Sequence, residues 1–168
     1  MKDTLKNIYP YIVIIVGVIL FRTFIITPVI VSGDSMVPNL ENRDLLLLRK
    51  IGYNSKSVKR HDIVVVKKDG TEIIKRVIGL PGEHISYKNN KLYVNDKYIK
   101  EDYYFRNTID FNLEEICSMS KIPEGKYLVL GDNRPISNDS RIFGLVDEKE
   151  IVGKAFVRIW PLNKIKTF

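Results

Sequence analysis

A single apolar run near the N-terminus limits most strongly what this chain can fold into. From Ile8 to Phe21 every residue is aliphatic, aromatic, glycine or proline, and the run resumes after Arg22 and Thr23. As an α-helix the uninterrupted part would be about 21 Å long, whereas a helix that crosses a bilayer core takes about 20 residues. Extending the helix to residue 26 supplies the missing length if the Arg22 guanidinium reaches the headgroups. We therefore predict an uncleaved membrane anchor over residues 8–26, preceded by a short tail at residues 1–7.

Two other interpretations of this run stay open. A cleaved signal peptide has a charged start, which Lys2 and Lys6 supply, but it also needs small residues three and one before the cut. The end of the run is bulky instead, at Ile25-Ile26-Thr27. A buried core helix is the second alternative, although apolarity on every face fits lipid better. Charge does not settle the orientation, because Lys2 and Lys6 stand on one side of the run and Arg22 on the other.

After the anchor, short segments rich in β-branched and aromatic residues alternate with turn signals. The expected helix in this part is short, over Leu113–Ser120. The pattern predicts a mainly β, antiparallel domain over residues 27–168, built as a β-barrel, partly open, or as a sandwich. The expected strands are Leu45–Arg49, Asp62–Lys67, Glu72–Ile78, Lys91–Val94, Tyr127–Leu130 and Ile151–Ile159.

Composition excludes several classes of function. The one cysteine, Cys117, excludes an intramolecular disulfide and a cysteine-rich zinc site. His61 and His84 are the only imidazoles in the sequence, so we expect no multi-histidine metal site. A net charge of +7 without a nucleic-acid motif favours proximity to an anionic membrane lipid surface over nucleic-acid binding.

Three polar clusters could carry chemistry. In residues 32–40, a turn after the anchor, Ser35 can present its hydroxyl while neighbouring backbone N–H groups hold an oxyanion. In residues 71–82, Lys75 and Arg76 are adjacent within an apolar strand. A buried lysine has a lowered pKa and can act as a base, whereas an arginine stays charged and needs a carboxylate partner. The third cluster, residues 131–144, is a loop whose Asp and Arg residues must pair if they are buried.

Each cluster also has a plainer interpretation. The first could be a polar turn, the second an edge strand whose lysine reaches water, and the third a solvent-exposed loop. Considered together, however, they offer a serine nucleophile and a lysine base without a histidine. A serine–lysine pair is a known variant of the Ser-His-Asp arrangement.

In this order, and behind an anchor, the clusters resemble the bacterial type I signal peptidase family, also called the leader peptidase family. The resemblance covers nearly the whole chain and looks like the short, Gram-positive branch, in which the family's extra domain is reduced here to residues 83–125. It is carried by residues 33–40 (GDSMVPNL), 60–66 (RHDIVVV), 75–83 (KRVIGLPGE) and 131–134 (GDNR), with Ser137, Asp139, Ser140 and Arg141.

The resemblance implies roles by position. Ser35 matches the family's nucleophile, Lys75 its general base, and Ser137 the serine that hydrogen-bonds and orients that lysine. The Ser35 backbone N–H would hold the oxyanion, and Gly33 stands where some relatives add a serine hydroxyl as a second donor. Two supporting ion pairs are implied as well: Asp139 with Arg141, and Asp132 with Arg76.

The resemblance further implies cleavage of secretory preproteins after a small-x-small motif, with neither metal nor nucleotide. The N-terminus would be cytoplasmic, and the catalytic domain would lie outside the cell membrane. Shallow apolar pockets would admit alanine while the substrate adds as an extended strand. By position, the residues that could line these pockets are Val29, Val31, Met36, Leu40 and Ile74.

Two alternatives belong to other classes. A repressor-cleaving Ser/Lys protease shares a related β core, but such proteins are soluble, self-cleaving and often joined to a DNA-binding helical domain. The anchor argues against that assignment, and membrane fractionation discriminates. The other alternative is a non-enzymatic anchored β module, which labelling of Ser35 by an acylating inhibitor would exclude.

Overall fold

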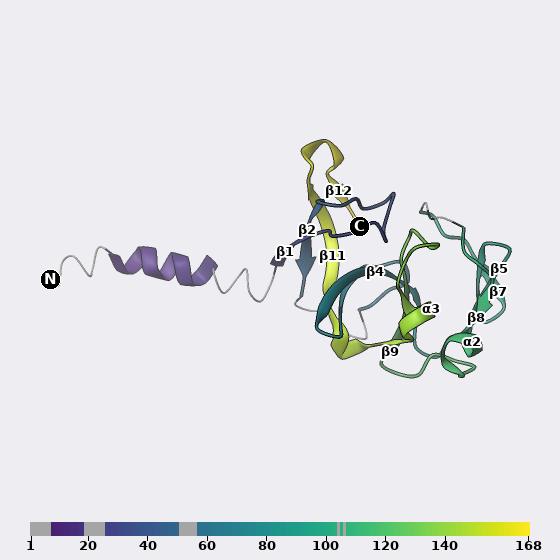
Figure 1. Ribbon diagram of the computed structural model, residues 1–168. Helices are drawn as coiled ribbons and strands as arrows, with labels where there is room; N and C mark the ends of the chain where they lie inside the picture. The colour runs from purple at the N-terminus through teal and green to yellow at the C-terminus, as the bar shows by residue number, and fades with distance from the viewer. Residues whose placement is uncertain (1–7, 19–25, 51–56, 104, 106) are drawn as a thin grey trace.

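The computed structural model describes residues 8–18, 26–50, 57–103, 105 and 107–168. A helix over residues 8–18, purple in Figure 1, precedes a β-rich body. Within these described ranges no helix is both long and apolar enough to cross a membrane. The predicted anchor over residues 8–26 includes residues 19–25, which lie outside the described residues.

The body is built on a sheet whose strands follow the order β1-β2-β11-β3-β4-β9-β10, with β12 paired to β11. All of these pairings are antiparallel, which confirms the predicted mainly β, antiparallel architecture. In the part of the chain that the structure describes, no pairing joins β1 to β10, so the sheet stays open and a closed barrel is not formed. The strands are β1 (Ile26–Ile30), β2 (Leu45–Arg49), β3 (Ile63–Lys68), β4 (Thr71–Gly79), β9 (Lys126–Leu130), β10 (Val146–Asp147), β11 (Ile151–Trp160) and β12 (Lys166–Thr167).

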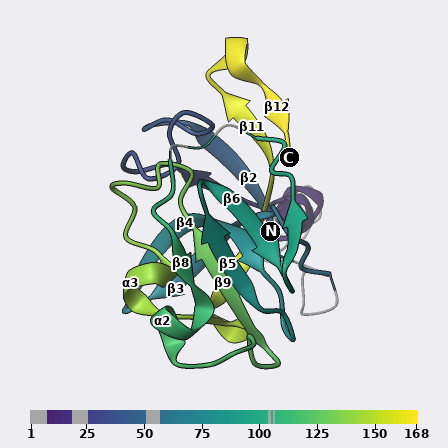
Figure 2. The same ribbon diagram turned by 90° about the vertical axis from the view of Figure 1, so that its right-hand side faces the viewer.

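A second, smaller antiparallel sheet falls within residues 83–125, in the order β7-β6-β5-β8. Its strands and α2 lie together beside the main sheet in Figures 1 and 2. They are β5 (Ile85–Lys88), β6 (Lys91–Val94), β7 (Lys97–Ile99) and β8 (Phe111–Asn112), followed by α2 (Leu113–Cys117). The remaining short helices are α3 (Ser140–Phe143), η1 (Glu148–Glu150) and η2 (Leu162–Lys164).

The predicted strands all occur, with bounds that agree or differ by one residue at one or both ends. The predicted helix over Leu113–Ser120 is shorter than expected, because Ser118 takes a left-handed backbone conformation (φ 56°) and caps α2 after Cys117. β1 is additional to the predicted strands: it begins at Ile26, where the anchor was expected to end, and pairs residue by residue with β2.

The core explains how the sheet supports a site. In β3, alternate side chains point to opposite faces: Ile63 and Val65 join one buried cluster, while Val64 and Val66 join another. The first of these, here called the cleft cluster, consists of Val31, Met36, Leu40, Leu46, Leu48, Ile63, Val65 and Ala155. A further cluster, which includes Ile78, Ile85, Leu92 and Leu128, joins the small sheet to the main one.

Candidate active site

Ser35 lies in the turn between β1 and β2, with its side chain half-buried. The turn is fixed against the sheet because Met36 and Leu40 are 1% and 0% exposed and belong to the cleft cluster. Gly33 has φ +87°, a left-handed conformation that L side chains rarely adopt. Its N–H donates to Asn42 Oδ1 at 3.3 Å. The turn therefore presents the Ser35 hydroxyl from a backbone held at both ends.

Lys75 lies in β4, which is an interior strand between β3 and β9 rather than an edge strand. The residue is 3% exposed, and its Nζ donates to Ser35 Oγ at 2.7 Å. Burial disfavours the ammonium form and lowers the pKa of Lys75 to about 8, although Asp139 and Asp132 act to raise it. The neutral amine is therefore accessible near neutral pH, beside a serine hydroxyl that can donate a proton to it.

Asn133 holds the backbone of the Ser35 turn from the loop that follows β9. Its N–H donates to Ser35 O at 2.9 Å, and its side-chain amide donates to Asp34 O at 3.0 Å. Gly131 allows the two segments to approach this closely, because a Cβ at this position would lie 2.5 Å from Ser35 O. The loop thus positions Ser35 through main-chain contacts.

The two implied ion pairs are both present. Arg141 Nε and Nη2 each lie 2.8 Å from the Asp139 carboxylate, which also accepts from Gly131 N–H at 3.1 Å. Arg76 Nε and Nη2 lie 2.8 and 2.6 Å from the two oxygens of Asp132. Lys75 and its neighbour Arg76 are thus both buried, and the arginine has the carboxylate partner that its permanent charge requires.

Ser137 does not make the hydrogen bond to Lys75 that the resemblance implies. The side chain is buried, with the residue 4% exposed, and its hydroxyl has no hydrogen-bond partner in the described part of the chain. The hydroxyl lies against Gly131, where a Cβ would come within 2.2 Å of it. Lys75 Nζ is directed to Ser35 instead, so the orienting role of Ser137 stays a prediction.

A cleft of about 170 Å³, lined by both apolar and polar side chains, opens beside the Ser35–Lys75 pair. Of the predicted pocket residues, Val29 and Ile74 line it directly, together with Ile30, Val65 and Ile73. Val31, Met36 and Leu40 do not line it; they are buried in the cleft cluster, against which Val29 and Ile74 pack. They form the layer under the cleft, and their contact with a substrate stays a prediction.

Sequence reasoning missed two asparagines that organise the site. Asn133 bonds the Ser35 turn, and Asn39 Nδ2 donates to Asp132 Oδ2 at 2.8 Å, which links the turn to the Arg76–Asp132 pair. Both lie inside the polar clusters identified from the sequence. One signal could have identified them: each asparagine is a polar side chain without an assigned role, in a segment that the fold buries.

Fold and site together define a β-rich protein in which a buried lysine contacts a half-buried serine at the edge of a cleft. The signal peptidase family model, peptidase S26, matches residues 1–160, and the chain therefore belongs to this family of peptidases. It is 42% identical over 173 residues to signal peptidase I of Bacillus caldolyticus, covering 97% of this chain and 95% of that protein. It is 38% identical over 179 residues to signal peptidase IB of Staphylococcus aureus, covering 98% and 94%. A solved structure of a signal peptidase I from Enterococcus faecalis V583 is similar at a TM-score of 0.54 and 39% identity, covering 58% of this chain and 96% of that one.

No group of three or more His, Cys, Asp or Glu side chains that could hold a metal ion is found among the residues described. The two carboxylates that act on the Lys75 pKa are engaged in ion pairs, Asp132 with Arg76 and Asp139 with Arg141.

Proposed function

We propose that this chain is a membrane-anchored signal peptidase I that removes N-terminal signal peptides from secretory preproteins, with Ser35 as nucleophile and Lys75 as general base. The observation that carries the proposal is the 2.7 Å contact between Lys75 Nζ and Ser35 Oγ, made by a lysine that is 3% exposed. The signal peptidase I relatives support the substrate class.

The chemistry follows from the state of the lysine. The neutral Lys75 amine takes the hydroxyl proton as Ser35 Oγ attacks the scissile carbonyl carbon, and the resulting ammonium gives that proton to the leaving amine. The acyl-enzyme ester is then attacked by a water whose proton Lys75 accepts. As the tetrahedral intermediate collapses, Lys75 gives this proton to the departing Ser35 Oγ, which releases the signal-peptide carboxylate and restores the serine hydroxyl and the neutral amine. The Ser35 backbone N–H stabilises the oxyanion of each tetrahedral intermediate.

The ion pairs support this chemistry by occupying the nearby carboxylates. Asp139 is bound by Arg141 and Asp132 by Arg76, so neither carboxylate forms an ion pair with Lys75. A lysine with a direct carboxylate partner would keep its proton, because an adjacent opposite charge favours the ionised form. The arrangement leaves burial as the dominant influence on Lys75.

The cleft matches a substrate with small side chains next to the cleaved bond. Its volume of about 170 Å³ and its lining by Val29 and Ile74 can accommodate small apolar side chains. β1 ends the sheet order and borders this cleft, so an extended peptide can add beside it with main-chain hydrogen bonds.

The proposal also includes the membrane anchor and the cellular location of the chain. The apolar run of residues 8–21, extended to residue 26, would hold the enzyme in the cell membrane as a single pass. The N-terminus would be cytoplasmic and the catalytic domain extracytoplasmic, where translocated preproteins emerge. Carbonate-washed membrane fractions should contain the chain, and release of the intact chain into the soluble fraction would refute the anchor.

The function is tested by cleavage of a preprotein with an Ala-x-Ala site, with the cut mapped by mass spectrometry. Wild type should cut after the second alanine, and Ser35→Ala and Lys75→Ala should both be inactive. Lys75→Arg should fail as completely as Lys75→Ala, because a guanidinium cannot accept the proton. Lys68→Arg, which changes a lysine paired with Glu150, is the matched control and should retain activity. Full activity in either Ser35→Ala or Lys75→Ala would refute the proposal.

A further inference from the structure

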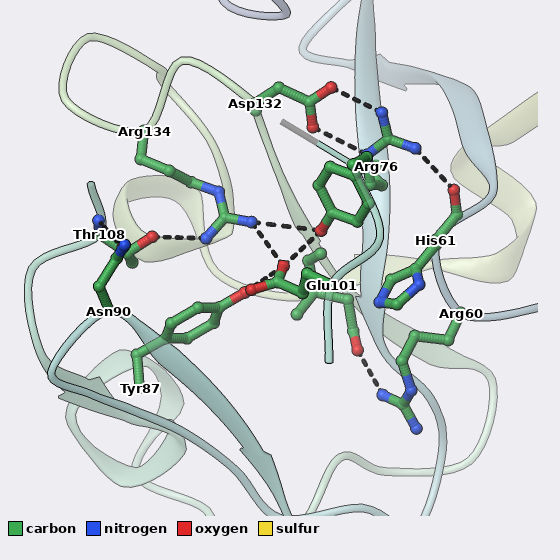
Figure 3. Close-up of polar contacts among 12 residues, drawn as sticks. Arg60, His61, Arg76, Tyr87, Asn90, Glu101, Thr108, Asp132 and Arg134 are labelled. Atoms are coloured by element: carbon green, nitrogen blue, oxygen red, sulfur yellow. Dashed lines mark hydrogen bonds and ion pairs between the residues drawn. The ribbon is translucent and has the colours of Figure 1, made fainter. Parts of the chain in front are cut away.

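A buried charged cluster outside the Ser35–Lys75 pair joins the small sheet to the loop after β9. Its centre is Glu101, whose side chain is 3% exposed. The Glu101 carboxylate accepts from the Tyr87 hydroxyl at 2.8 Å and from Arg134 Nη2 at 2.8 Å, as Figure 3 shows. It also accepts from the Tyr103 hydroxyl. Three donors from three segments thus converge on one carboxylate.

Arg134 reaches into the small sheet from the catalytic side, and its side chain is 0% exposed. Its Nη1 donates to Thr108 Oγ1 at 2.6 Å, and its guanidinium lies 5.0 Å from the ring centre of Tyr87 and 4.4 Å from that of Phe105. Burial disfavours the charged form, but Tyr87 and Glu101 outweigh it and raise the pKa of Arg134, so the guanidinium stays charged. Because a pair buried this deeply gains little net stability, its value lies in holding one geometry.

One end of this cluster leads to Ser35. Arg134 directly follows Asn133, the residue whose N–H and side-chain amide hold the backbone of the Ser35 turn. The Arg134 carbonyl also accepts from Arg141 Nη2 at 2.6 Å, which ties it to the Asp139–Arg141 pair. Fixing the Arg134 side chain therefore fixes the segment that positions the serine.

The other end of this cluster contacts Arg76, the neighbour of Lys75 in β4. The Tyr103 ring lies under the Arg76 guanidinium, with 3.9 Å between the guanidinium carbon and the ring centre. Arg76 directly follows Lys75 in β4 and is itself bound to Asp132. The Glu101 carboxylate thus binds both Tyr103, which packs on the neighbour of Lys75, and Arg134, which follows Asn133 in the chain.

We propose that Glu101 is a positioning residue for the peptidase: by holding Arg134 and Tyr103 it sets the geometry between Ser35 and Lys75. On this proposal, residues 83–125 contribute to catalysis, because they supply the Glu101 carboxylate that binds both Arg134 and Tyr103. The catalytic part of this inference rests on the proposed function. Its structural part, the coupling of Glu101 to the Asn133 segment, does not.

The kinetic test uses Glu101→Gln in the full-length chain, with Glu150→Gln as a matched control. Glu150 makes a partly exposed ion pair with Lys68 and does not contact the cluster. Active sites are first titrated with an acylating inhibitor, so that an unfolded fraction does not lower the measured rate. Per titrated site, kcat for Glu101→Gln should fall roughly ten- to a hundredfold with KM nearly unchanged. A per-site kcat equal to that of wild type and of the control would overturn the inference.

A double variant tests whether Glu101 acts through Arg134. Arg134→Lys keeps the charge but loses the paired N–H donors, so its per-site kcat should fall like that of Glu101→Gln. The double variant should then lose little more than either single variant. Losses that multiply independently would show that the residues act separately, which would contradict the positioning role.

Hydrogen exchange tests the coupling without any activity. Glu101→Gln should speed exchange of the Gly131, Asn133 and Ser137 amides, which bond Asp139 Oδ2, Ser35 O and Asn133 O. Faster exchange confined to residues 83–125 would overturn the inference even if preprotein is cleaved. If wild type fails to cleave any preprotein, the proposed function fails, and the exchange result alone decides whether Glu101 braces the loop.

Discussion

Replacing Lys75 with methionine should stabilise the protein while abolishing its activity. Burial lowers the pKa of Lys75 from 10.5 to about 8. At about 1.4 kcal/mol for each pKa unit, holding this lysine charged in the folded state costs up to about 3 kcal/mol. Methionine has a similar length and no charge to desolvate, so Lys75→Met removes this cost at neutral pH.

The pH dependence gives the prediction its sign. Between about pH 8 and 10.5 the unfolded chain still binds the Lys75 proton whereas the folded chain does not, so the stability of wild type rises with pH across this window. The cost is complete below about pH 8 and vanishes above about pH 10.5. Lys75→Met should therefore be more stable by up to about 3 kcal/mol at about pH 7, and by less than about 1 kcal/mol at about pH 10.

Urea unfolding of the full-length chain in mild detergent measures both differences. Lys154→Met is the matched control, because Lys154 is a partly exposed lysine of the same sheet that pairs with Asp62 at 2.6 Å. It should not gain stability, and its difference from wild type should not shrink in this pH window. A Lys75→Met protein that is less stable than wild type at neutral pH, or whose advantage is independent of pH, would refute the reasoning.

Three further predictions follow from the same site. The kcat/KM for preprotein cleavage should rise about tenfold between about pH 7 and 9, with its midpoint near the Lys75 pKa of about 8; a flat profile would contradict the general-base role. Asp132→Asn leaves the buried Arg76 without its counter-charge, so the free energy of unfolding should fall by about 3 kcal/mol in urea titrations, and a loss below about 1 kcal/mol would count against the pair. Gly131→Ala places a Cβ 2.5 Å from Ser35 O, so cleavage should fall at least about tenfold while far-ultraviolet circular dichroism is retained; unchanged cleavage would show that the loop can yield.

Local patterns in the sequence predict much of the fold. β2 and β6 begin and end where alternating apolar residues and turn signals place them, because those signals act within a few residues. β1 could not be separated from the apolar run in the same way. Its residues, Ile26–Ile30, continue that run, and only the pairing with β2, which lies beyond the Ser35 turn, makes them a strand.

The contacts of the site also differ in whether sequence motifs or long-range packing determine them. The proximity of Ser35 to Lys75 and the two ion pairs could be predicted because family motifs give these residues by position. The contacts of Asn133 and Glu101 could not, since each depends on segments far apart in the chain that meet only after the sheets pack. The Ser137 hydroxyl, expected on Lys75, faces Gly131 instead, a difference set by side-chain direction rather than by residue type.

The place of β11 in the sheet has a consequence for biosynthesis. β11 lies between β2 and β3, so it joins the strands that border the Ser35 turn to those that carry Lys75. Because a ribosome makes the N-terminal part first, Ser35 and Lys75 both exist well before residues 151–160 have been made. The main sheet that joins the Ser35 turn to the strand of Lys75 can therefore be completed only late in synthesis.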